Sequence, residues 1–388
     1  MAVFAMRQLL IRFSFVLLST LNMNSSAVAN ETLVFISEFA ASKEGGISVF
    51  RLDEKSSLLE SAYRIDEVEH PFYLALSPTK NLLYSVHAAT FGGSNNEHVA
   101  AFEFTSSQSK LLNRQSSLGT ASCYLDVDAT GKTVLVANYS TGSVASLPIE
   151  PDGTLGEKAS FVQHKGSSVN KERQEGPHAH CFTISPDNRF AFAADLGLDQ
   201  IRAYCINPDS NQLVPTKQCF VRTIPGAGPR HLTFHPNEKY VYVINELANS
   251  ITLFDYEKDT SFLIERTTIS TLPADFSGTS HTADLKITPN GQFLYGTNRG
   301  HDSIAAYRIG DDGQLTLLRI WPSLGKGPQN LAISPSGELL FCANMPGNNV
   351  IVFRINESDG ALSPTGQELK LTKPSCIVIR SSDSEATE

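Results

Sequence analysis

Residues 331–355 read LAISPSGELLFCANMPGNNVIVFRI, which divides into three short apolar segments separated by two turns. The first segment (331–334) leads into a Ser-Pro turn, the second (339–343) ends before Asn344, and the third (349–355) follows a turn rich in Gly and Asn. Apolar segments of this length between Pro, Gly and Asn turns are typical of β-strands. The stretch therefore predicts three consecutive antiparallel strands.

The same pattern recurs along most of the chain. The equivalent turns are centred on Pro78, Ala129, Pro186, Pro236, Pro289 and Pro335. Their spacings are 51, 57, 50, 53 and 46 residues. Nine residues after each turn stands a polar residue, in order His87, Asn138, Asp195, Asn245, Asn298 and Asn344. A constant offset inside a variable spacing indicates one repeated structural unit rather than several unrelated domains.

A fourth, more variable strand completes each unit. It follows an Asp-Gly-x-Leu turn, which is found at residues 152–155, 312–315 and 359–362. Such a turn joins neighbouring antiparallel strands. Four antiparallel strands in roughly 45–50 residues are typical of one blade of a β-propeller.

The two ends of the chain each supply part of one further blade. Residues 33–37 and 46–52 match the second and third strands of a blade, and residues 373–379 match a first strand with nothing after it. We therefore predict an all-β fold, a seven-bladed β-propeller whose last blade is closed by strands from both termini. A shared blade leaves no open sheet edge in the ring.

The first 29 residues differ from the rest of the chain. Arg7 and Arg12 precede an apolar run from Phe13 to Leu21, and residues 27–29 read AVA, the small-x-small pattern that signal peptidases cleave. The run is too short to cross a bilayer. We interpret residues 1–29 as a secretory signal peptide and residues 30–388 as a single propeller domain, exported to the periplasm or secreted, with no membrane span after cleavage.

Charge and composition exclude several function classes. The chain has 388 residues, 41% of them hydrophobic and 18% charged, with a formal net charge of −9. This acidic balance, without basic runs, argues against binding to nucleic acid. No pair of cysteines has CxxC spacing, so we expect no metal site and no cofactor. Cys205 and Cys219 flank a turn, where a hairpin disulfide and two buried thiols are both compatible with the sequence.

The repeat register points to one end of the central channel. In a blade, the start of the innermost first strand and the end of the second strand lie at the same edge of the sheet. At these positions three successive blades carry His180, Arg230, Glu246 and Arg299, where the other blades carry mostly apolar or neutral residues. We predict that these four side chains converge on one channel mouth. They form either an ionic network that closes the channel or a site for an anion, and two arginines against one Glu favour the anion.

Three further residues are candidates for binding the substrate. His178 lies one alternation away from His180, and Asp284 is a further polar residue near the same mouth. Asn298 is one of the six polar residues that follow a turn by nine positions. We also interpret it as a turn residue or a residue lining the channel.

Four motifs in a fixed order carry a resemblance to a known family. Residues 177–180 read PHAH, residues 226–237 read GAGPRHLTFHPN, residues 245–247 read NEL, and residues 297–300 read TNRG. Together they resemble the seven-bladed propeller lactonases, the family of the propeller-type 6-phosphogluconolactonase and the fungal carboxymuconate lactonizing enzyme. The resemblance covers nearly the whole chain after the signal peptide.

The resemblance implies a lactonase, a carboxylic ester hydrolase acting on a small anionic lactone. The family's active-site residues fall on His180, Arg230, Glu246 and Arg299, the same four that the register selects. Glu246 or His180 would act as general base, while Arg230 and Arg299, in either order, would stabilise the oxyanion and hold the anionic group. Alternative functions are a carboxymuconate-type cycloisomerase and a non-catalytic exported propeller that binds a ligand or partner. The predicted export departs from the cytosolic setting of phosphogluconolactone.

Overall fold

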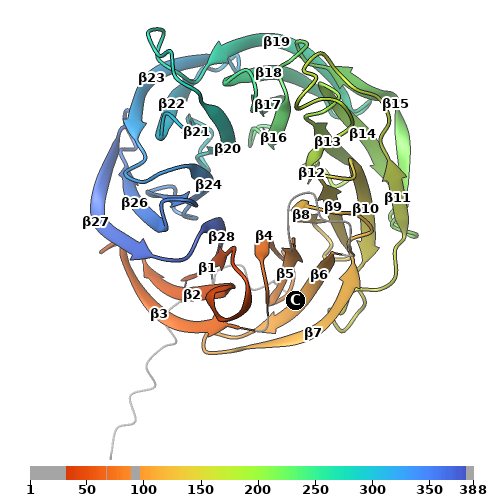
Figure 1. Cartoon of the computed structure of the whole chain (residues 1–388), viewed down its shortest axis with the longest axis horizontal. Coiled ribbons are helices and arrows are strands. Elements are labelled where there is room, and N and C mark those ends of the chain that lie inside the picture. Colours follow the sequence, from red (N-terminus) through yellow and green to blue (C-terminus); the bar gives the residue numbers. More distant parts are fainter. Residues whose placement is uncertain (1–31, 67, 89–96, 382–388) are drawn as a thin grey trace, which may run out of the picture.

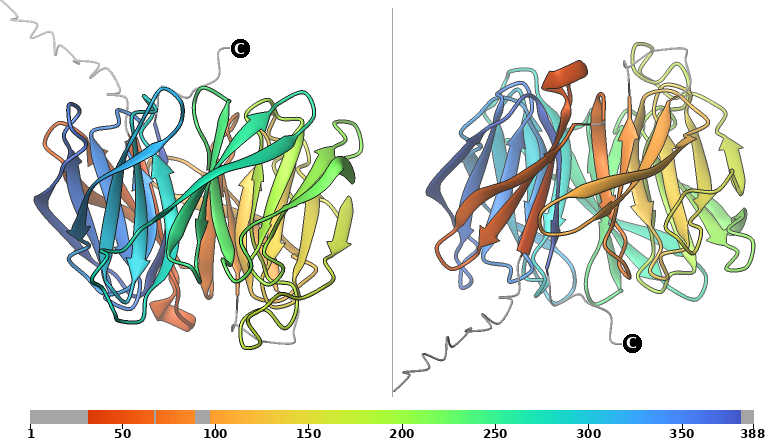
Figure 2. Two further views of the ribbon diagram at one scale, coloured as in Figure 1. Left: turned by 90° about the horizontal axis from the view of Figure 1, so that it is seen from above. Right: turned by 90° about the horizontal axis from the view of Figure 1, so that it is seen from below.

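The computed structural model describes residues 32–66, 68–88 and 97–381, which fold into a ring of seven four-stranded antiparallel sheets (Figure 1). The predicted seven-bladed propeller is confirmed. Figure 2 shows that the strands run roughly along the axis of the ring, so that the turns between them gather on its two faces. The predicted signal peptide, residues 1–29, lies outside the described residues.

Each sheet contains four kinds of strand, ordered from the channel outward. The innermost strands are β4 (Pro71–Leu76), β8 (Ser122–Val127), β12 (Ala179–Ile184), β16 (Pro229–Phe234), β20 (His281–Ile287), β24 (Pro328–Ile333) and β28 (Pro374–Arg380). The second strands are β1 (Thr32–Glu38), β5 (Leu82–His87), β9 (Thr133–Asn138), β13 (Phe190–Asp195), β17 (Tyr240–Asn245), β21 (Phe293–Arg299) and β25 (Leu339–Asn344).

The third strands are β2 (Gly46–Asp53), β6 (His98–Phe104), β10 (Ser143–Pro148), β14 (Gln200–Ile206), β18 (Ser250–Glu257), β22 (Ser303–Ile309) and β26 (Asn349–Ile355). The outermost strands are β3 (Leu58–Ile65), β7 (Ser109–Ser116), β11 (Ser160–Gln163), β15 (Leu213–Arg222), β19 (Phe262–Ser270), β23 (Leu315–Pro322) and β27 (Leu362–Lys370). A short 3₁₀ helix, η1 (Ser42–Glu44), joins β1 to β2.

The hydrophobic core lies between neighbouring blades rather than at the centre of the ring. The second strands β5, β9, β13 and β25 are buried along their whole length, because each packs against a blade on either side. Phe192 of one blade and Val243 of the next, for example, belong to the same cluster of buried side chains. The outermost strands are largely exposed, as in β23. Burial on both faces accounts for the nearly continuous apolar character of the second strands.

Closure of the ring joins the two ends of the described chain. β28 pairs with β1 in the first sheet, with Phe35 opposite Val378, and the order across this sheet is β28-β1-β2-β3. The predicted shared blade is therefore confirmed. The first strand of this blade comes from the C-terminal end, and the other three come from the N-terminal end.

The constant nine-residue offset has a physical cause. The residue at this position ends the second strand in five units, and in the sixth Asn298 stands one residue before the end of β21. Where the residue is Asn or Asp, its side chain ties the following turn to neighbouring chain segments. The Asn138 side chain donates to Ser143 Oγ at 3.2 Å and to the Ser117 carbonyl at 3.0 Å, and it accepts a bond from Ser122 Oγ. A side-chain amide has both a donor and an acceptor, so it can form hydrogen bonds with buried backbone groups that have no partner in the sheet.

All six cysteines are free thiols. The alternative of a hairpin disulfide between Cys205 and Cys219 is therefore not realised. Within the described ranges, no helix is long and apolar enough to span a membrane.

Candidate active site

Four ionisable side chains meet at one mouth of the central channel. His180 lies on β12, Arg230 lies on β16, Glu246 follows β17 directly, and Arg299 ends β21. They share this edge because the inner and second strands of each blade run antiparallel. The register of the repeat thus places together the four residues that it singled out.

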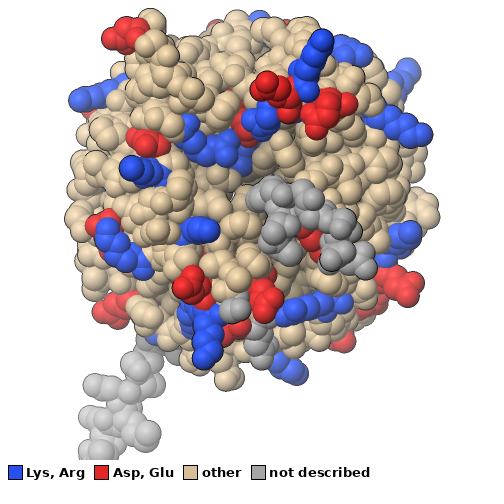
Figure 3. All heavy atoms as spheres, viewed as in Figure 1, with Lys and Arg blue, Asp and Glu red and all other residues tan. Residues whose placement is uncertain are grey.

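These four residues line a pocket of about 290 Å³. Its walls are completed by Phe72, Tyr139, Arg173, Gln329 and Met345. Figure 3 views the propeller from this side and shows Lys and Arg side chains beside the hollow at its centre.

Glu246 is the centre of the cluster. Its Oε2 atom lies 3.0 Å from Arg230 Nε, 3.0 Å from Arg299 Nη2 and 4.0 Å from His180 Nε2, and its Oε1 atom accepts a bond of 2.7 Å from Arg173 Nη2. Burial alone would raise the pKa of Glu246, but the surrounding arginines outweigh it and hold this pKa well below its ordinary value. Glu246 is therefore ionised at neutral pH and a poor acceptor for a further proton.

Arg173 is the residue of the cluster that the repeat register missed. It lies in the segment between β11 and β12, outside the strands, and its Nη2 also donates to Tyr139 Oη at 3.2 Å. The available sequence signal was the spacing of 57 residues across this segment, the longest of the five spacings. An insertion into an otherwise regular repeat commonly carries function on one face of a propeller.

The loop that carries Arg173 is held by its own hydrogen bonds. Asn170 Oδ1 accepts from the backbone N–H groups of Glu172 and Arg173, and the Gln174 side chain bonds both Asn170 N and the Leu196 carbonyl. Gln174 is fully buried. Such local bonding fixes the direction in which Arg173 leaves the loop, so this guanidinium is presented to the pocket without a regular strand.

Arg230 is almost completely buried, with 1% of its surface exposed. Its Nε binds Glu246, and its Nη1 donates to the Ala283 carbonyl and to His231 Nε2. Burial, followed by the charge of Arg299, lowers the pKa of Arg230 to about 10, so the side chain stays protonated at neutral pH. Among the described residues Nη2 has no hydrogen-bond partner, which leaves that nitrogen for a ligand in the pocket.

His180 is neutral at physiological pH. Burial, and then the positive charge of Arg230, hold its pKa well below the ordinary value of 6.5. Its Nδ1 lies 3.6 Å from Cys123 Sγ, and its Nε2 lies on the side of Glu246. A neutral imidazole can accept a proton, and the nearby Glu246 carboxylate would stabilise the imidazolium that results.

The structure places His178 and Asn298 beside the pocket rather than in its wall. The ring of His178 stacks on Tyr139, with centroids 4.6 Å apart, and its Nδ1 donates to the Tyr139 carbonyl at 3.0 Å. Asn298 is fully buried, and its amide donates to the Thr271 carbonyl and to Ser303 Oγ. Its amide makes the same kind of bonds as that of Asn138, to a preceding carbonyl and to the Ser hydroxyl five residues on. Substrate binding by either residue stays a sequence-based prediction.

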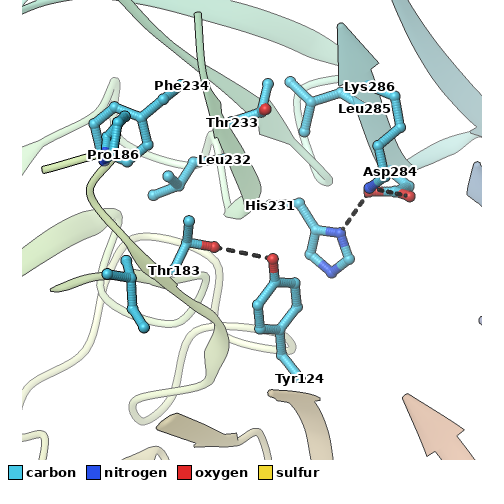
Figure 4. Close-up of a pocket in the computed structure, with 11 residues that line it drawn as sticks. Tyr124, Thr183, Pro186, His231, Leu232, Thr233, Phe234, Asp284, Leu285 and Lys286 are labelled. Atoms are coloured by element: carbon cyan, nitrogen blue, oxygen red, sulfur yellow. Dashed lines mark hydrogen bonds and ion pairs between the residues drawn. The ribbon is translucent and has the colours of Figure 1, made fainter. Parts of the chain in front are cut away.

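Asp284 faces the other end of the channel. It lines a second cavity of about 320 Å³, together with residues such as His231 and Lys286 (Figure 4). Its carboxylate bonds both of these side chains, at 2.9 Å to His231 Nδ1 and 2.9 Å to Lys286 Nζ. Asp284 does not line the pocket that contains Glu246, and its carboxylate is connected to that pocket through His231, which bonds Arg230.

In the part of the chain that the structure describes, no three His, Cys, Asp or Glu side chains are grouped so that they could hold a metal ion. The cluster at the mouth is dominated by cations, which would repel one. The chemistry that the arrangement supports is binding of an anion, proton transfer at a neutral His and stabilisation of an oxyanion.

Comparisons with known proteins identify the family of the chain. The family model described as "Lactonase, 7-bladed beta-propeller" matches residues 33–379. The 6-phosphogluconolactonase of Bacillus subtilis is 30% identical over 346 residues, covering 88% of this chain and 97% of the relative. That of Formosa agariphila is 32% identical over 352 residues, covering 89% and 98%. The structure of a periplasmic gluconolactonase from Pseudomonas aeruginosa superposes with a TM-score of 0.84 at 29% identity, covering 90% of this chain and 98% of that one.

Proposed function

This chain belongs to the family of seven-bladed β-propeller lactonases, and we propose that it hydrolyses an anionic, sugar-type lactone at the mouth of its channel. One observation carries the proposal. Arg173, Arg230 and Arg299 meet the single carboxylate of Glu246 inside one pocket, so two positive charges remain unbalanced there. In a protein of net charge −9, such a pocket attracts an anion and stabilises the charge that develops on a lactone carbonyl.

The space beside the pocket supports a substrate larger than a bare lactone ring. A cavity of about 630 Å³ adjoins the pocket and shares Arg299, Gln329 and Met345 with it. Lys326 and Lys373 also line this cavity. A polyhydroxylated chain ending in a phosphate or carboxylate would therefore meet further positive charge. A phosphorylated sugar lactone, the substrate named for the relatives in Bacillus and Formosa, has these features.

We assign the general base to His180 rather than to Glu246. The pKa values of both residues are lowered, but both oxygens of Glu246 are engaged by arginines, which compete with a water molecule for them. His180 is neutral and lines the pocket, and its Nε2 lies 4.0 Å from Glu246 Oε2, beyond hydrogen-bond distance. Glu246 then has two tasks: it orients the three arginines, and it stabilises the imidazolium.

The proposed reaction runs in two steps. His180 takes a proton from a water molecule as its oxygen attacks the lactone carbonyl carbon, and the resulting oxyanion is stabilised by the free Nη2 of Arg230. The bond between that carbon and the ring oxygen then breaks. His180 returns the proton to the leaving oxygen, which yields a hydroxy acid. Arg173 and Arg299, which are partly exposed, hold the anionic group of the substrate.

We also infer that the enzyme acts outside the cytoplasm as a single domain, residues 30–388. The charged and apolar pattern of residues 1–29 supports this inference, as does the periplasmic gluconolactonase of Pseudomonas aeruginosa among the similar structures. An exported enzyme would meet sugar lactones that form outside the cytosol.

A hydrolysis assay tests the function. The purified protein is supplied with gluconolactone, 6-phosphogluconolactone and muconolactone, and proton release is followed in a pH-stat. We expect hydrolysis with a preference for an anionic lactone. His180→Ala should lower kcat by about 100-fold or more, the usual contribution of a general base. His98→Ala, which alters an exposed histidine of β6, serves as the matched control and should leave kcat unchanged.

The other functions give different results in the same assay. A cycloisomerase would interconvert muconolactone and an unsaturated dicarboxylate without opening sugar lactones. A binding module would open none of the three lactones. Either outcome would replace the proposed hydrolase.

A further inference from the structure

A buried His–Asp pair lies directly behind Arg230, on the side away from the mouth. His231 follows Arg230 on β16, and Asp284 lies on β20 of the next blade. His231 Nδ1 is 2.9 Å from Asp284 Oδ1, and His231 Nε2 is 3.2 Å from Arg230 Nη1. In Figure 4 the ring of His231 points toward Asp284, above Tyr124. An imidazole thus bridges a carboxylate and the guanidinium of the candidate active site.

The protonation of this pair follows from its surroundings. Lys286 and His231 lower the pKa of Asp284 against the opposing effect of burial, so the carboxylate is ionised and can only accept hydrogen bonds. His231 must then carry its proton on Nδ1. Burial, followed by the charge of Arg230, lowers the pKa of His231 to about 4, so the ring is neutral at neutral pH. Its Nε2 therefore offers a lone pair to Arg230 Nη1.

Asp284 is itself held rigidly. Lys286 Nζ bonds both of its oxygens, and Oδ2 also accepts from Asn330 Nδ2 at 2.8 Å and from the Leu331 backbone N–H at 3.0 Å. These donors come from two blades, on β20 and β24. A carboxylate with so many fixed donors cannot rotate freely, and it therefore fixes the orientation of the His231 ring.

We propose that His231 and Asp284 are positioning residues for the lactonase reaction, which place the Arg230 guanidinium so that its Nη2 faces the substrate oxyanion. The inference rests on the proposed function. Asp284 fixes the Nδ1–H tautomer of His231, and the Nε2 lone pair of His231 and the Ala283 carbonyl together hold Nη1. With Nε bound to Glu246, the plane of the guanidinium is set at three points. Asp284 then acts through His231 and Arg230, from outside the pocket where the substrate binds.

The cavity lined by Asp284 does not need a ligand to account for its polar groups. Tyr124 Oη and Thr183 Oγ1 bond each other at 2.9 Å, and the charges of Lys286 and Asp284 are paired (Figure 4). These polar groups therefore have partners within the protein. The arrangement is therefore that of a support for Arg230 rather than that of a second binding site.

Two substitutions of His231 separate its two hydrogen bonds. His231→Gln retains an acceptor oxygen near the place of Nε2, and His231→Asn retains only a donor near the place of Nδ1. We expect His231→Asn to lower kcat by roughly 10-fold to 100-fold with little change in KM, the pattern for loss of an interaction made in the transition state. His231→Gln should recover most of the activity. Equal losses in both variants would overturn the proposal.

A double-mutant cycle adds a test that a purely structural role would not satisfy. In an Arg230→Ala background, His231→Asn should change kcat by less than about twofold, because the positioned group is already absent. If His231→Asn costs the same factor with and without Arg230, His231 does not act through Arg230.

The tautomer of His231 can be measured without any substrate. In ¹⁵N NMR spectra of the wild-type protein, His231 should be neutral with its proton on Nδ1 from pH 6 to pH 8. A charged ring or an Nε2–H tautomer in this range would overturn the positioning role. If the wild-type enzyme opened no lactone while the Nδ1–H tautomer was present, the proposed function would fail and the device behind Arg230 would stand.

Discussion

The two ends of the central channel each contain a buried carboxylate among cations, yet the two clusters differ in how their charges are balanced. At the end of the channel away from the mouth, which we call the lower end, Asp284 pairs with Lys286. It also accepts hydrogen bonds from neutral groups that the protein holds in place. At the mouth, Glu246 faces three arginines, of which Arg173 and Arg299 keep 33% and 26% of their side chains exposed. Both carboxylates, Glu246 and Asp284, are buried, and the pKa of each is lowered by neighbouring cations. The surplus of accessible positive charge distinguishes the proposed ligand site at the mouth from the cluster at the other end, whose charges are paired within the protein.

The largest effect on stability is expected at the lower end. Asp284→Ala should reduce the free energy of unfolding by about 3 kcal/mol, because it leaves Lys286, Asn330 and the Leu331 N–H without their buried partner. Urea denaturation measures the loss. Asp311→Ala, at an exposed position, is the control and should change stability by less than about 0.5 kcal/mol. A loss as small as that of the control would remove the contrast between the two ends.

At the mouth, replacing a charged residue with Ala should reduce catalysis more than stability. Arg299→Ala should lower kcat/KM for an anionic lactone by about 100-fold, since it removes one of the two accessible cations that meet the substrate. Its free energy of unfolding should fall by less than about 1 kcal/mol, because the side chain is partly exposed. Steady-state kinetics and urea denaturation of one preparation give both values. Arg266→Ala, which removes an arginine of β19 on the outside of the ring, is the matched control.

A smaller effect is expected for the arginine supplied by the loop. Arg173→Gln should raise KM for an anionic lactone by about tenfold and leave KM for uncharged gluconolactone within about twofold. The reason is that Arg173 adds charge to the pocket, whereas the strands supply the other two arginines. Lys171→Gln, in the same loop and exposed, controls for a general loss of positive charge. Equal changes for both lactones would show that Arg173 acts only through Glu246.

The smallest effect is expected on kcat/KM when the pH is lowered from 8 to 6. The pKa of His180 is lowered, so its active, neutral form persists as the pH falls through 6.5. Glu246 stays ionised because its pKa is lowered, and Arg230 stays protonated because its pKa is about 10. With uncharged gluconolactone, kcat/KM should therefore change by less than about twofold between pH 8 and pH 6. An ordinary histidine base would retain only about a quarter of its activity at pH 6, and that result would exclude His180 in its buried, neutral state.

The sequence was informative wherever spacing alone determines position. Seven blades and their closure could be predicted because the turns and the polar residues after the second strands recur at a fixed offset. Most of these polar residues have a local hydrogen-bonding task such as that of Asn138. The convergence of His180, Arg230, Glu246 and Arg299 followed from the same register. Arg173 could not be predicted, since it lies on an irregular loop whose path depends on bonds such as that of Gln174 to the Leu196 carbonyl.

The end of the channel that Asp284 faces could not be predicted from the repeat register either. Its position on the inner strand is correct, but whether it faces the pocket depends on a bulge near the start of β20, where the pairing shifts between Thr282 and Leu285. Similar shifts occur near the start of β12 and β16. Such irregularities decide which side chains point to which end of the channel, and spacing along the sequence does not reveal them.

The pairing of β28 with β1 also sets the order in which the ring can form. Ser37 and Ser375 bond each other across a sequence separation of 338 residues, while every other blade is built from one continuous stretch of chain. Contacts that join such distant segments form late and slowly. The last seam of the ring therefore cannot close until β28 has been synthesised, and six complete blades must wait beside an unfinished one. Closure of this seam would mark the moment at which the molecule becomes a single cooperative unit.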